Sequence, residues 1–457
     1  MAKFTVTYDD FSGGQWVGGR SRAKQPKNTF EGLDMVPEPG SGYLMPTGRW
    51  TTGQASYNRP NPVVADSAYA WYADRGNQKV GYYQWPSGTP SDVSSTAHPP
   101  VEGDGVLFDG KFVCPAYLTN EILIAAVGDT NTTPVSAPDD LYALCVYDAW
   151  IFGASASNPN RLYYCAAYDP ATWASGSYYD VGSVTDYISR MVQHNGGLYI
   201  ATNGGWYVGY GIPGETFSLR KLTDTTTDIT AAVDAGPRIF FTATHGRALM
   251  EELSGTEVSE VGWGVEPDGG PVRVGRFVVG LSLDGDYFLY DTALRVWLGV
   301  ANPGSALIPP QTPAYSGQVL GVTDESAYYY RTIYPSTAGW NGTTFDESSA
   351  LLADYMHKSS FRVREVIAEV ELDTTNTTAA RTLKVAVLTP GHPDMAIATA
   401  SAAATTEQTY TWNVAGTGQV AVVRLGVNDH PATYLAQPRV KLAGVKLRRL
   451  ILVCEET

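Results

Sequence analysis

Short apolar runs separated by turn residues recur along the middle of the chain. From about residue 64 to about residue 334, each copy reads as an apolar strand, a short turn, a second strand, a second turn and a third strand. The clearest copies begin at Gly105, Leu144, Arg190, Ala231 and Val272, and weaker copies begin near Ala68 and Ser316. They start about 38 to 48 residues apart, a spacing typical of the four-stranded blades of a β-propeller.

The residues between the runs favour hairpins. Dipeptides able to supply positive φ lie between the second and third runs of several copies, at Asn203-Gly204, His245-Gly246 and Asp284-Gly285. Similar dipeptides lie one strand earlier, at Asp109-Gly110 and Asn195-Gly196. Two copies also end in a Tyr-Asp turn followed by a tryptophan, Trp173 or Trp297, which fits an outer fourth strand with one anchoring aromatic.

About seven such units fit before residue 340, and each hides an apolar face only when it stacks on its neighbours. We therefore predict an all-β fold, with a propeller of about seven blades over residues 51–345. A pair of β-sandwiches is the alternative, but it needs no sustained period near about 42 residues. A β-helix would repeat over a much shorter distance.

The pattern changes after Pro335. Residues 336–357 read as a linker, and longer apolar or alternating runs follow, beginning at Phe361, Arg381, Gln408, Val420 and Gly444. We predict a C-terminal β-sandwich over residues 346–457. Basic residues gather near its end, and they form either a solvated strand face or a docking surface for an acidic partner: Arg439, Lys441, Lys446, Arg448 and Arg449.

The first 50 residues do not read as a blade and are rich in glycine, proline and isolated aromatics. We expect residues 1–50 to form an irregular segment that packs on the propeller. The aromatic side chains that would hold it there are Phe11, Trp16, Tyr43 and Trp50.

Composition agrees with an all-β chain, because 47 Gly supply turns while 29 Tyr and 11 Trp suit pleated surfaces. The formal net charge of -15 argues against tight nucleic-acid binding, which needs Lys and Arg. It does not argue against DNA that slides past a repelling surface. The sequence contains no apolar run of about 18 residues and no N-terminal signal-peptide pattern, so we expect no membrane partner.

The sequence contains no readable active site, and we expect no enzyme activity, catalytic residue, cofactor or metal. The candidate carboxylates Asp109, Asp148 and Asp234 follow apolar strands, where Asp stabilises turns; the alternative is a propeller glycosidase, which needs two converging carboxylates. The six histidines show no ligand spacing, with two placed in hairpin turns and four in loops: His194 and His245, then His98, His357, His392 and His430.

The four cysteines lack metal-ligand spacing, so buried free thiols are expected at Cys114, Cys145, Cys165 and Cys454. Cys145 and Cys165 flank a predicted hairpin, which leaves a close approach open. A second alternative function is carbohydrate binding for host recognition, with sugars stacked on Trp71, Trp206 or Trp263. For each of these tryptophans, a place in the core competes with that role.

The opening of the chain resembles the tail nozzle proteins of short-tailed bacteriophages, also called tail tubular protein B-like proteins. The resemblance covers about 40 residues and is supported by the repeats and the C-terminal β region. The matching elements are Asp10 with Phe11-Ser12-Gly13-Gly14, then Asn28 through Asp34, then Gly40-Ser41-Gly42-Tyr43. The chain departs from the usual Arg-Pro-Gly ending, where it reads Met45-Pro46-Thr47-Gly48.

The resemblance implies a structural protein of the virion tail. Members of that family assemble as a homohexameric ring below the portal and its adaptor, extend the DNA channel and take part in genome ejection. It therefore implies as partners other copies of the chain, the portal-adaptor and other tail proteins, and DNA that passes through without sequence-specific binding. An acidic wall suits this role, because many phosphate contacts would slow the DNA.

Overall fold

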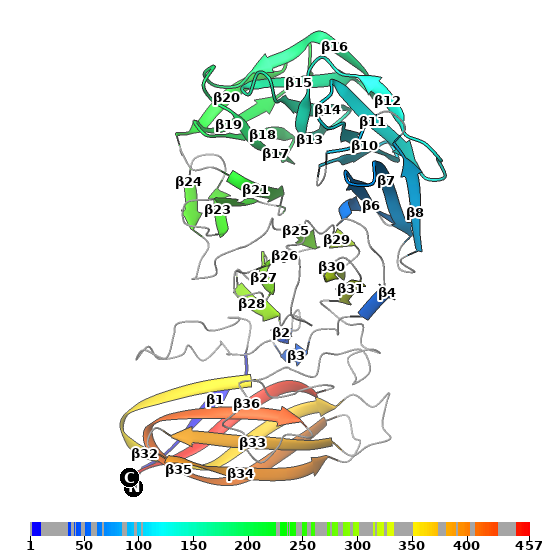
Figure 1. Ribbon diagram of the computed structural model, residues 1–457. Coiled ribbons are helices and arrows are strands. Elements are labelled where there is room, and N and C mark those ends of the chain that lie inside the picture. Colours follow the sequence, from blue (N-terminus) through cyan, green and yellow to red (C-terminus); the bar gives the residue numbers. More distant parts are fainter. Residues whose placement is uncertain are drawn as a thin grey trace. The chain divides into compact units, whose positions relative to one another are not determined.

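The computed structural model describes residues 104–224 without a break and, with gaps, residues 2–10, 35–101 and 229–457; residues 11–34 and 428–444 are among those it does not describe. Every regular element in the described part is a β-strand (Figure 1). The all-β prediction is therefore confirmed.

Seven four-stranded antiparallel sheets follow one another along the described chain, which confirms the predicted propeller of about seven blades. Blades 1 to 4 comprise β5 (Pro62–Ala65), β6 (Tyr69–Asp74), β7 (Lys79–Gln84) and β8 (Thr89–Ser94); β9 (Val106–Phe108), β10 (Lys111–Pro115), β11 (Glu121–Ala126) and β12 (Thr133–Ser136); β13 (Leu141–Tyr147), β14 (Trp150–Ser155), β15 (Arg161–Ala166) and β16 (Asp169–Asp180); and β17 (Ile188–His194), β18 (Gly197–Thr202), β19 (Gly205–Tyr210) and β20 (Ser218–Thr223).

Blades 5 to 7 comprise β21 (Ile229–Asp234), β22 (Ile239–Ala243), β23 (Leu249–Leu253) and β24 (Glu257–Glu260); β25 (Val272–Val274), β26 (Phe277–Leu281), β27 (Tyr287–Asp291) and β28 (Val296–Val300); and β29 (Ala314–Tyr315), β30 (Gln318–Thr323) and β31 (Ala327–Thr332) with β4 (Thr51–Ala55). β4 precedes blade 1 in the sequence and completes blade 7 by pairing with β31, so the two ends of the propeller sequence meet in this blade. This closure removes a sheet edge that would otherwise remain open.

The hydrophobic cores lie between blades rather than within them. Leu198 and Ile200 of β18 pack with Phe152 of blade 3, whereas Tyr199 and Ala201 of the same strand pack with blade 5. Side chains that alternate along a strand therefore serve two different cores. A single blade buries neither of its faces alone, which explains why the apolar pattern repeats through consecutive blades.

Strands from both ends of the sequence form an eight-stranded sheet in the order β2-β3-β36-β32-β35-β33-β34, with β1 paired to β36. They are β1 (Lys3–Tyr8), β2 (Met35–Pro37), β3 (Leu44–Pro46), β32 (Leu351–Leu372), β33 (Arg381–Thr389), β34 (His392–Ala402), β35 (Glu407–Val427) and β36 (Val445–Glu456). Hydrogen bonds connect all eight strands, so the predicted C-terminal β-sandwich is one continuous sheet rather than two separate ones.

Bulges keep the apolar face of the long strand β32 pointing into one core. Phe361 and Val363 are buried, and the buried positions then shift by one residue to Val366, Ala368 and Val370. The pairing register shifts between Val363 and Glu365 against both neighbouring strands. An extra residue at this point reverses the alternation, which a strict two-residue pattern in the sequence does not reveal.

Three expectations about the chain ends need correction. Within the first 50 residues, the described parts are strands of the C-terminal sheet, and Tyr43 lies beside the Arg448 guanidinium of β36, 5.3 Å from its ring centroid. Residues 351–357 of the expected linker begin β32. The runs at Gln408 and Val420 belong to the single strand β35, and the sequence reading missed β34. Phe11, Trp16 and Trp50 lie outside the described residues.

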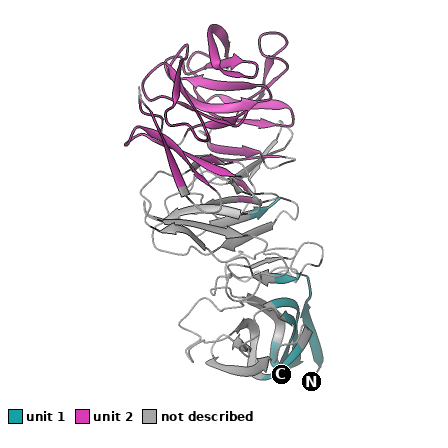
Figure 2. Ribbon diagram, turned by 90° about the vertical axis from the view of Figure 1, so that its right-hand side faces the viewer, with its two compact units in different colours: residues 1–51, 286–303, 331–457 teal, residues 52–285, 304–330 magenta. Residues whose placement is uncertain are grey.

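The chain divides into two compact units (Figure 2). One contains residues 1–51, 286–303 and 331–457, and with them every strand of the eight-stranded sheet. The other contains residues 52–285 and 304–330, and with them the first strand of every blade. The groups considered below as candidate sites in the propeller all lie in this second unit.

Candidate functional site

The turns between the first and second strands of the blades bring several sequence-predicted residues to one edge of the propeller. In an antiparallel meander this turn falls at the same edge in every blade. Asp109 and Gly110 have φ of 50° and 72°, and Asn195 and Gly196 have φ of 47° and 72°. Two consecutive positive φ values define the type I′ hairpin, so the structure confirms both of these predicted turns.

The predicted turn at Asn203-Gly204 also joins two strands, but its positive φ of 130° belongs to Gly205. Gly205 cannot be replaced by a residue with a side chain, because its Cβ would lie 2.1 Å from the Thr223 carbonyl oxygen. The turns at His245-Gly246 and Asp284-Gly285 lie outside the described residues.

Asp148 combines a turn conformation with a contact to the next blade. Its φ is 49°, and its carboxylate accepts a hydrogen bond of 2.9 Å from Gln193 Nε2 of β17. The side chain therefore bonds blade 3 to blade 4 at the turn edge.

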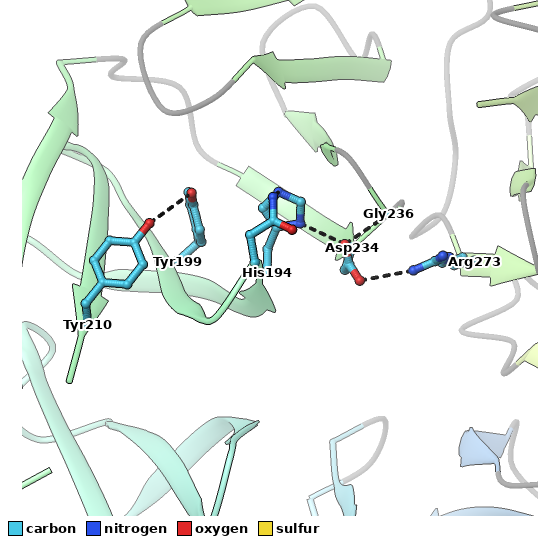
Figure 3. A network of polar contacts seen from close by, with 7 residues as sticks. His194, Tyr199, Tyr210, Asp234, Gly236 and Arg273 are labelled. Atoms are coloured by element: carbon cyan, nitrogen blue, oxygen red, sulfur yellow. Dashed lines mark hydrogen bonds and ion pairs between the residues drawn. The ribbon is translucent and has the colours of Figure 1, made fainter. Parts of the chain in front are cut away.

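A second carboxylate, Asp234 at the end of β21, has partners in two other blades (Figure 3). One of its oxygens lies 2.8 Å from His194 Nδ1 of blade 4, and also accepts a 3.0 Å bond from the Gly236 amide. The other lies 3.0 Å from an Arg273 guanidinium nitrogen of blade 6. Asp234 thus links three consecutive blades.

The hydrogen bonds of His194 define how its ring is used. The Asp234 carboxylate can only accept, so Nδ1 carries the proton of that bond. Nε2 lies 2.9 Å from the Asn195 side-chain amide nitrogen, a donor, so Nε2 accepts. The ring is 5% exposed and packs edge-on against Tyr199, with ring centroids 5.4 Å apart. Both ring nitrogens are hydrogen-bonded within the chain, so this arrangement suits a link between blades better than a general base. We call the group formed by Asp234, His194 and Arg273 the inter-blade clasp.

The three candidate carboxylates therefore occupy turns of three different blades: Asp109 in blade 2, Asp148 in blade 3 and Asp234 in blade 5. The sequence identified Asp234 and His194 separately but not their pairing, it identified Asn195 as a turn residue only, and it missed Gln193 and Arg273. The signal that could have found them is positional. Residues at the end of the first strand or in the following turn of each copy must meet at one edge if the copies are blades.

The other histidines serve local roles where the structure describes them. His98 Nδ1 lies 2.7 Å from a carboxylate oxygen of Glu121. His357 and His392 lie in β32 and β34 rather than in the expected loops, because β32 begins before the predicted start at Phe361 and β34 was not predicted. His245 and His430 lie outside the described residues.

Two of the tryptophans considered for sugar stacking are core residues. Trp71 and Trp206 are each 1% exposed. Trp71 stacks on Phe112 of blade 2 at 5.3 Å, and Trp206 packs on Phe241 of blade 5 at 5.2 Å. Neither ring offers a face to a ligand, and Trp263 lies outside the described residues. Trp173 anchors the fourth strand of blade 3 as expected, and its indole N–H donates to the Pro170 carbonyl at 2.9 Å.

All four cysteines are free and buried, as predicted. Burial raises the pKa of Cys145 to about 12, of Cys165 to about 11 and of Cys454 to about 12. The Cys165 sulfur accepts a 3.0 Å bond from the Ile151 amide. Cys145 lies on β13 and Cys165 on β15, two strands that β14 separates. The two side chains also face different cores, one shared with blade 4 and the other with blade 2, and they form no disulfide.

The basic residues of β36 have partners on the neighbouring strand. Arg449 lies 3.2 Å from Glu369, and both Lys446 and Arg448 reach Glu371, at 3.7 Å and 3.4 Å. These contacts are cross-strand ion pairs on β32 and β36. Arg439 and Lys441 lie outside the described residues.

Within the described residues, no group of three or more His, Cys, Asp or Glu side chains is arranged to hold a metal ion. A separate finding concerns membranes: the described part of the chain contains no helix long and apolar enough to span one.

No family model matches the sequence, and no curated protein matches it. Among solved structures, the chain is similar to a streptogramin B lyase, with 10% identity and a TM-score of 0.49 over 63% of this chain and 98% of that one. It is similar to virginiamycin B lyase from Staphylococcus aureus, with 10% identity and a TM-score of 0.48 over 67% and 100%. It is also similar to BamB from Moraxella catarrhalis, with 10% identity and a TM-score of 0.42 over 62% and 97%. Likeness at this level says nothing about shared activity.

Proposed function

We propose that the protein is a structural subunit of a virion tail, a nozzle protein that assembles as a homohexameric ring. In this role it extends the DNA channel below the portal and adaptor and takes part in genome ejection. Its partners are other copies of the chain, the portal-adaptor and other tail proteins, and DNA that passes without sequence-specific contacts.

One observation carries the proposal: the segment with the tail-nozzle resemblance is joined to the C-terminal sheet. Asp10 begins the motif two residues after the end of β1, and β1 pairs with β36 from Lys3 opposite Glu455 to Tyr8 opposite Leu450. Tyr43, in the third motif element, lies beside Arg448 of the same strand. The two ends of the chain thus share one sheet, with the propeller strands between them in the sequence. Such a sheet offers a stable base on which a ring interface can be built.

The chemistry of the described residues supports a structural role rather than a catalytic one. Hydrogen bonds between blades are made by Asp148, His194 and Asp234. The hydrophobic cores between blades contain Trp71 and Trp206. The formal net charge of -15 is compatible with DNA that must leave quickly, because a surface poor in phosphate contacts does not retain it.

The test is assembly. The full-length chain is mixed with the portal and adaptor proteins of its own virus, and native mass spectrometry and electron microscopy measure the number of copies and the presence of an open channel. A closed ring of six copies with a central opening wide enough for duplex DNA supports the proposal. A chain that remains monomeric in the presence of both partners contradicts it.

A further inference from the structure

A pocket of about 290 Å³ lies at the turn edge of blades 3 and 4, apart from the inter-blade clasp. Its walls come from β14, β15 and β16 of blade 3 and from the loop between β19 and β20 of blade 4. The residues that matter here are Trp150, Tyr164, Thr172, Ile212, Pro213 and Glu215. Every residue from 104 to 224 is described, so the whole pocket is defined.

The blade 4 wall of the pocket is held in place by hydrogen bonds. The Ile212 carbonyl accepts bonds of 3.0 Å from three successive amides, beginning at Glu215. The Gly214 amide donates to the Tyr179 hydroxyl of blade 3 at 2.8 Å, and Phe217 packs on Tyr179 with ring centroids 4.8 Å apart. A wall fixed in this way loses little entropy when a ligand binds.

The chemistry of the lining is apolar and aromatic with negative charge at one side. Ile212 is 45% exposed, although large apolar side chains usually avoid water. Glu215 is exposed, and no Lys, Arg or His is among the residues that line the pocket. Thr172 donates to Asp169 at 2.6 Å, and this bond, with that from the Ala171 amide, lowers the pKa of Asp169. A second carboxylate is therefore ionised beside the pocket.

The protein already uses this combination of groups on the same blade. The Arg161 guanidinium carbon lies 4.0 Å from the centre of the Tyr178 ring, and its Nε lies 3.3 Å from an oxygen of Asp180. A planar cation is thus held by one aromatic face and one carboxylate. The pocket offers a carboxylate at Glu215 and a partly exposed aromatic ring at Trp150, with no cation from its own lining. The ring of Tyr164, which also lines the pocket, stacks on Tyr179 with centroids 5.4 Å apart.

We propose that this pocket binds the side chain of an arginine from a partner polypeptide. The apolar stem of the arginine lies along Ile212 and Pro213, and the guanidinium meets the Trp150 ring and Glu215. The negative charge of the lining makes it complementary to a cation. The inference does not depend on the tail role, because its test measures ligand binding at the pocket and not the assembly of a ring.

The probe is N-acetyl-arginine amide, and its neutral isostere N-acetyl-citrulline amide is the control. Isoleucine δ-methyl groups of the full-length protein are labelled with carbon-13, and the Ile212 signal is assigned through Ile212→Val. We expect the arginine probe to shift this signal saturably with a Kd on the order of 1–10 mM, as suits one side chain in a half-open pocket. The citrulline probe should bind about tenfold more weakly, because it lacks the charge.

Two variants test the assigned role of the carboxylate. Glu215→Gln keeps the shape of an exposed side chain and should weaken arginine binding about tenfold. Asp224→Asn also removes one negative charge from blade 4, at a side chain that is 92% exposed and outside the pocket, and should leave binding unchanged.

Three outcomes would overturn the proposal: an Ile212 signal unmoved by the arginine probe up to about 100 mM, an equal response to citrulline, or unchanged binding in Glu215→Gln. A monosaccharide that shifts the Ile212 signal when the arginine probe does not would also overturn it, and would assign the pocket to sugars instead.

Discussion

The blades and the C-terminal sheet are both antiparallel, but they are stabilised in different ways. In blades 1 to 6, neighbouring strands are neighbours in the sequence, and a strand such as β18 sends alternate side chains into two cores. In the C-terminal sheet, β36 pairs with β1 and with β32. Its partner residues in β1 are more than 400 positions away in the sequence, and those in β32 are 73 to 95 positions away. The first arrangement repeats local information, and the second depends on pairings that only the whole chain can form.

The largest expected effect comes from opening a core between blades. Phe152 is fully buried and packs on Phe217 of blade 4 with ring centroids 5.4 Å apart. Phe152→Ala should lower the free energy of unfolding of the propeller by about 3–5 kcal/mol through lost burial and a cavity. Urea unfolding followed by tryptophan fluorescence measures it. Val184→Ala, at a side chain that is 83% exposed, is the control and should stay within about 0.5 kcal/mol.

The next test breaks the sheet from the chain's beginning. Val6 of β1 is 2% exposed, so Val6→Asp buries a carboxylate with no cationic partner among the described residues around it. The free energy of unfolding of the sheet should fall by about 2–4 kcal/mol. Hydrogen exchange should rise in β36, the strand that β1 covers, and stay unchanged in blades 3 and 4. If the protection of the β36 amides against hydrogen exchange were the same in the variant as in the unchanged protein, β1 would contribute little to the sheet.

The same contrast explains what the sequence could predict. Blades 2 to 4 were visible because each contains its own hairpins, with Asp109-Gly110 and Asn195-Gly196 marking the turns at residue level. The segment KFTVTY alternates apolar and polar residues as a strand does, but nothing in it identifies the distant strand β36 as its partner. The bulges in β32 disguised its continuous pairing. Asp234 was identifiable as a turn residue, but its bonds to His194 and Arg273 depend on how three blades stack.

A medium effect is expected from the inter-blade clasp. Asp234→Asn removes the charge that holds Arg273 and His194 and should lower the free energy of unfolding of the propeller by about 1–2 kcal/mol. Asp109→Asn is the matched control, because Asn tolerates the same positive φ in a turn. Urea unfolding of both variants decides the matter: equal stabilities would mean that the clasp adds nothing beyond the turn itself.

The smallest effect compares one thiol from each region. Burial raises the pKa of Cys145 in the blades and of Cys454 in the sheet to about 12. The ordinary pKa of a thiol is 9.0, so above that pH the unfolded state gains stability by ionising while both folded thiols stay protonated. The stabilising contribution is complete below pH 9 and is lost as the pH rises toward 12.

Between pH 8 and pH 10, each buried thiol should account for a loss of about 1 kcal/mol in the free energy of unfolding of its own region. Cys145→Ala should reduce this pH dependence for the propeller alone by the share of one thiol, since Cys114 and Cys165 remain buried there, and Cys454→Ala should remove the thiol contribution of the C-terminal sheet alone. Urea unfolding at both pH values, with hydrogen exchange to separate the regions, measures it. If either variant flattened both regions equally, the two would unfold as one cooperative unit, and the contrast between local blades and a long-range sheet would not extend to their stabilities.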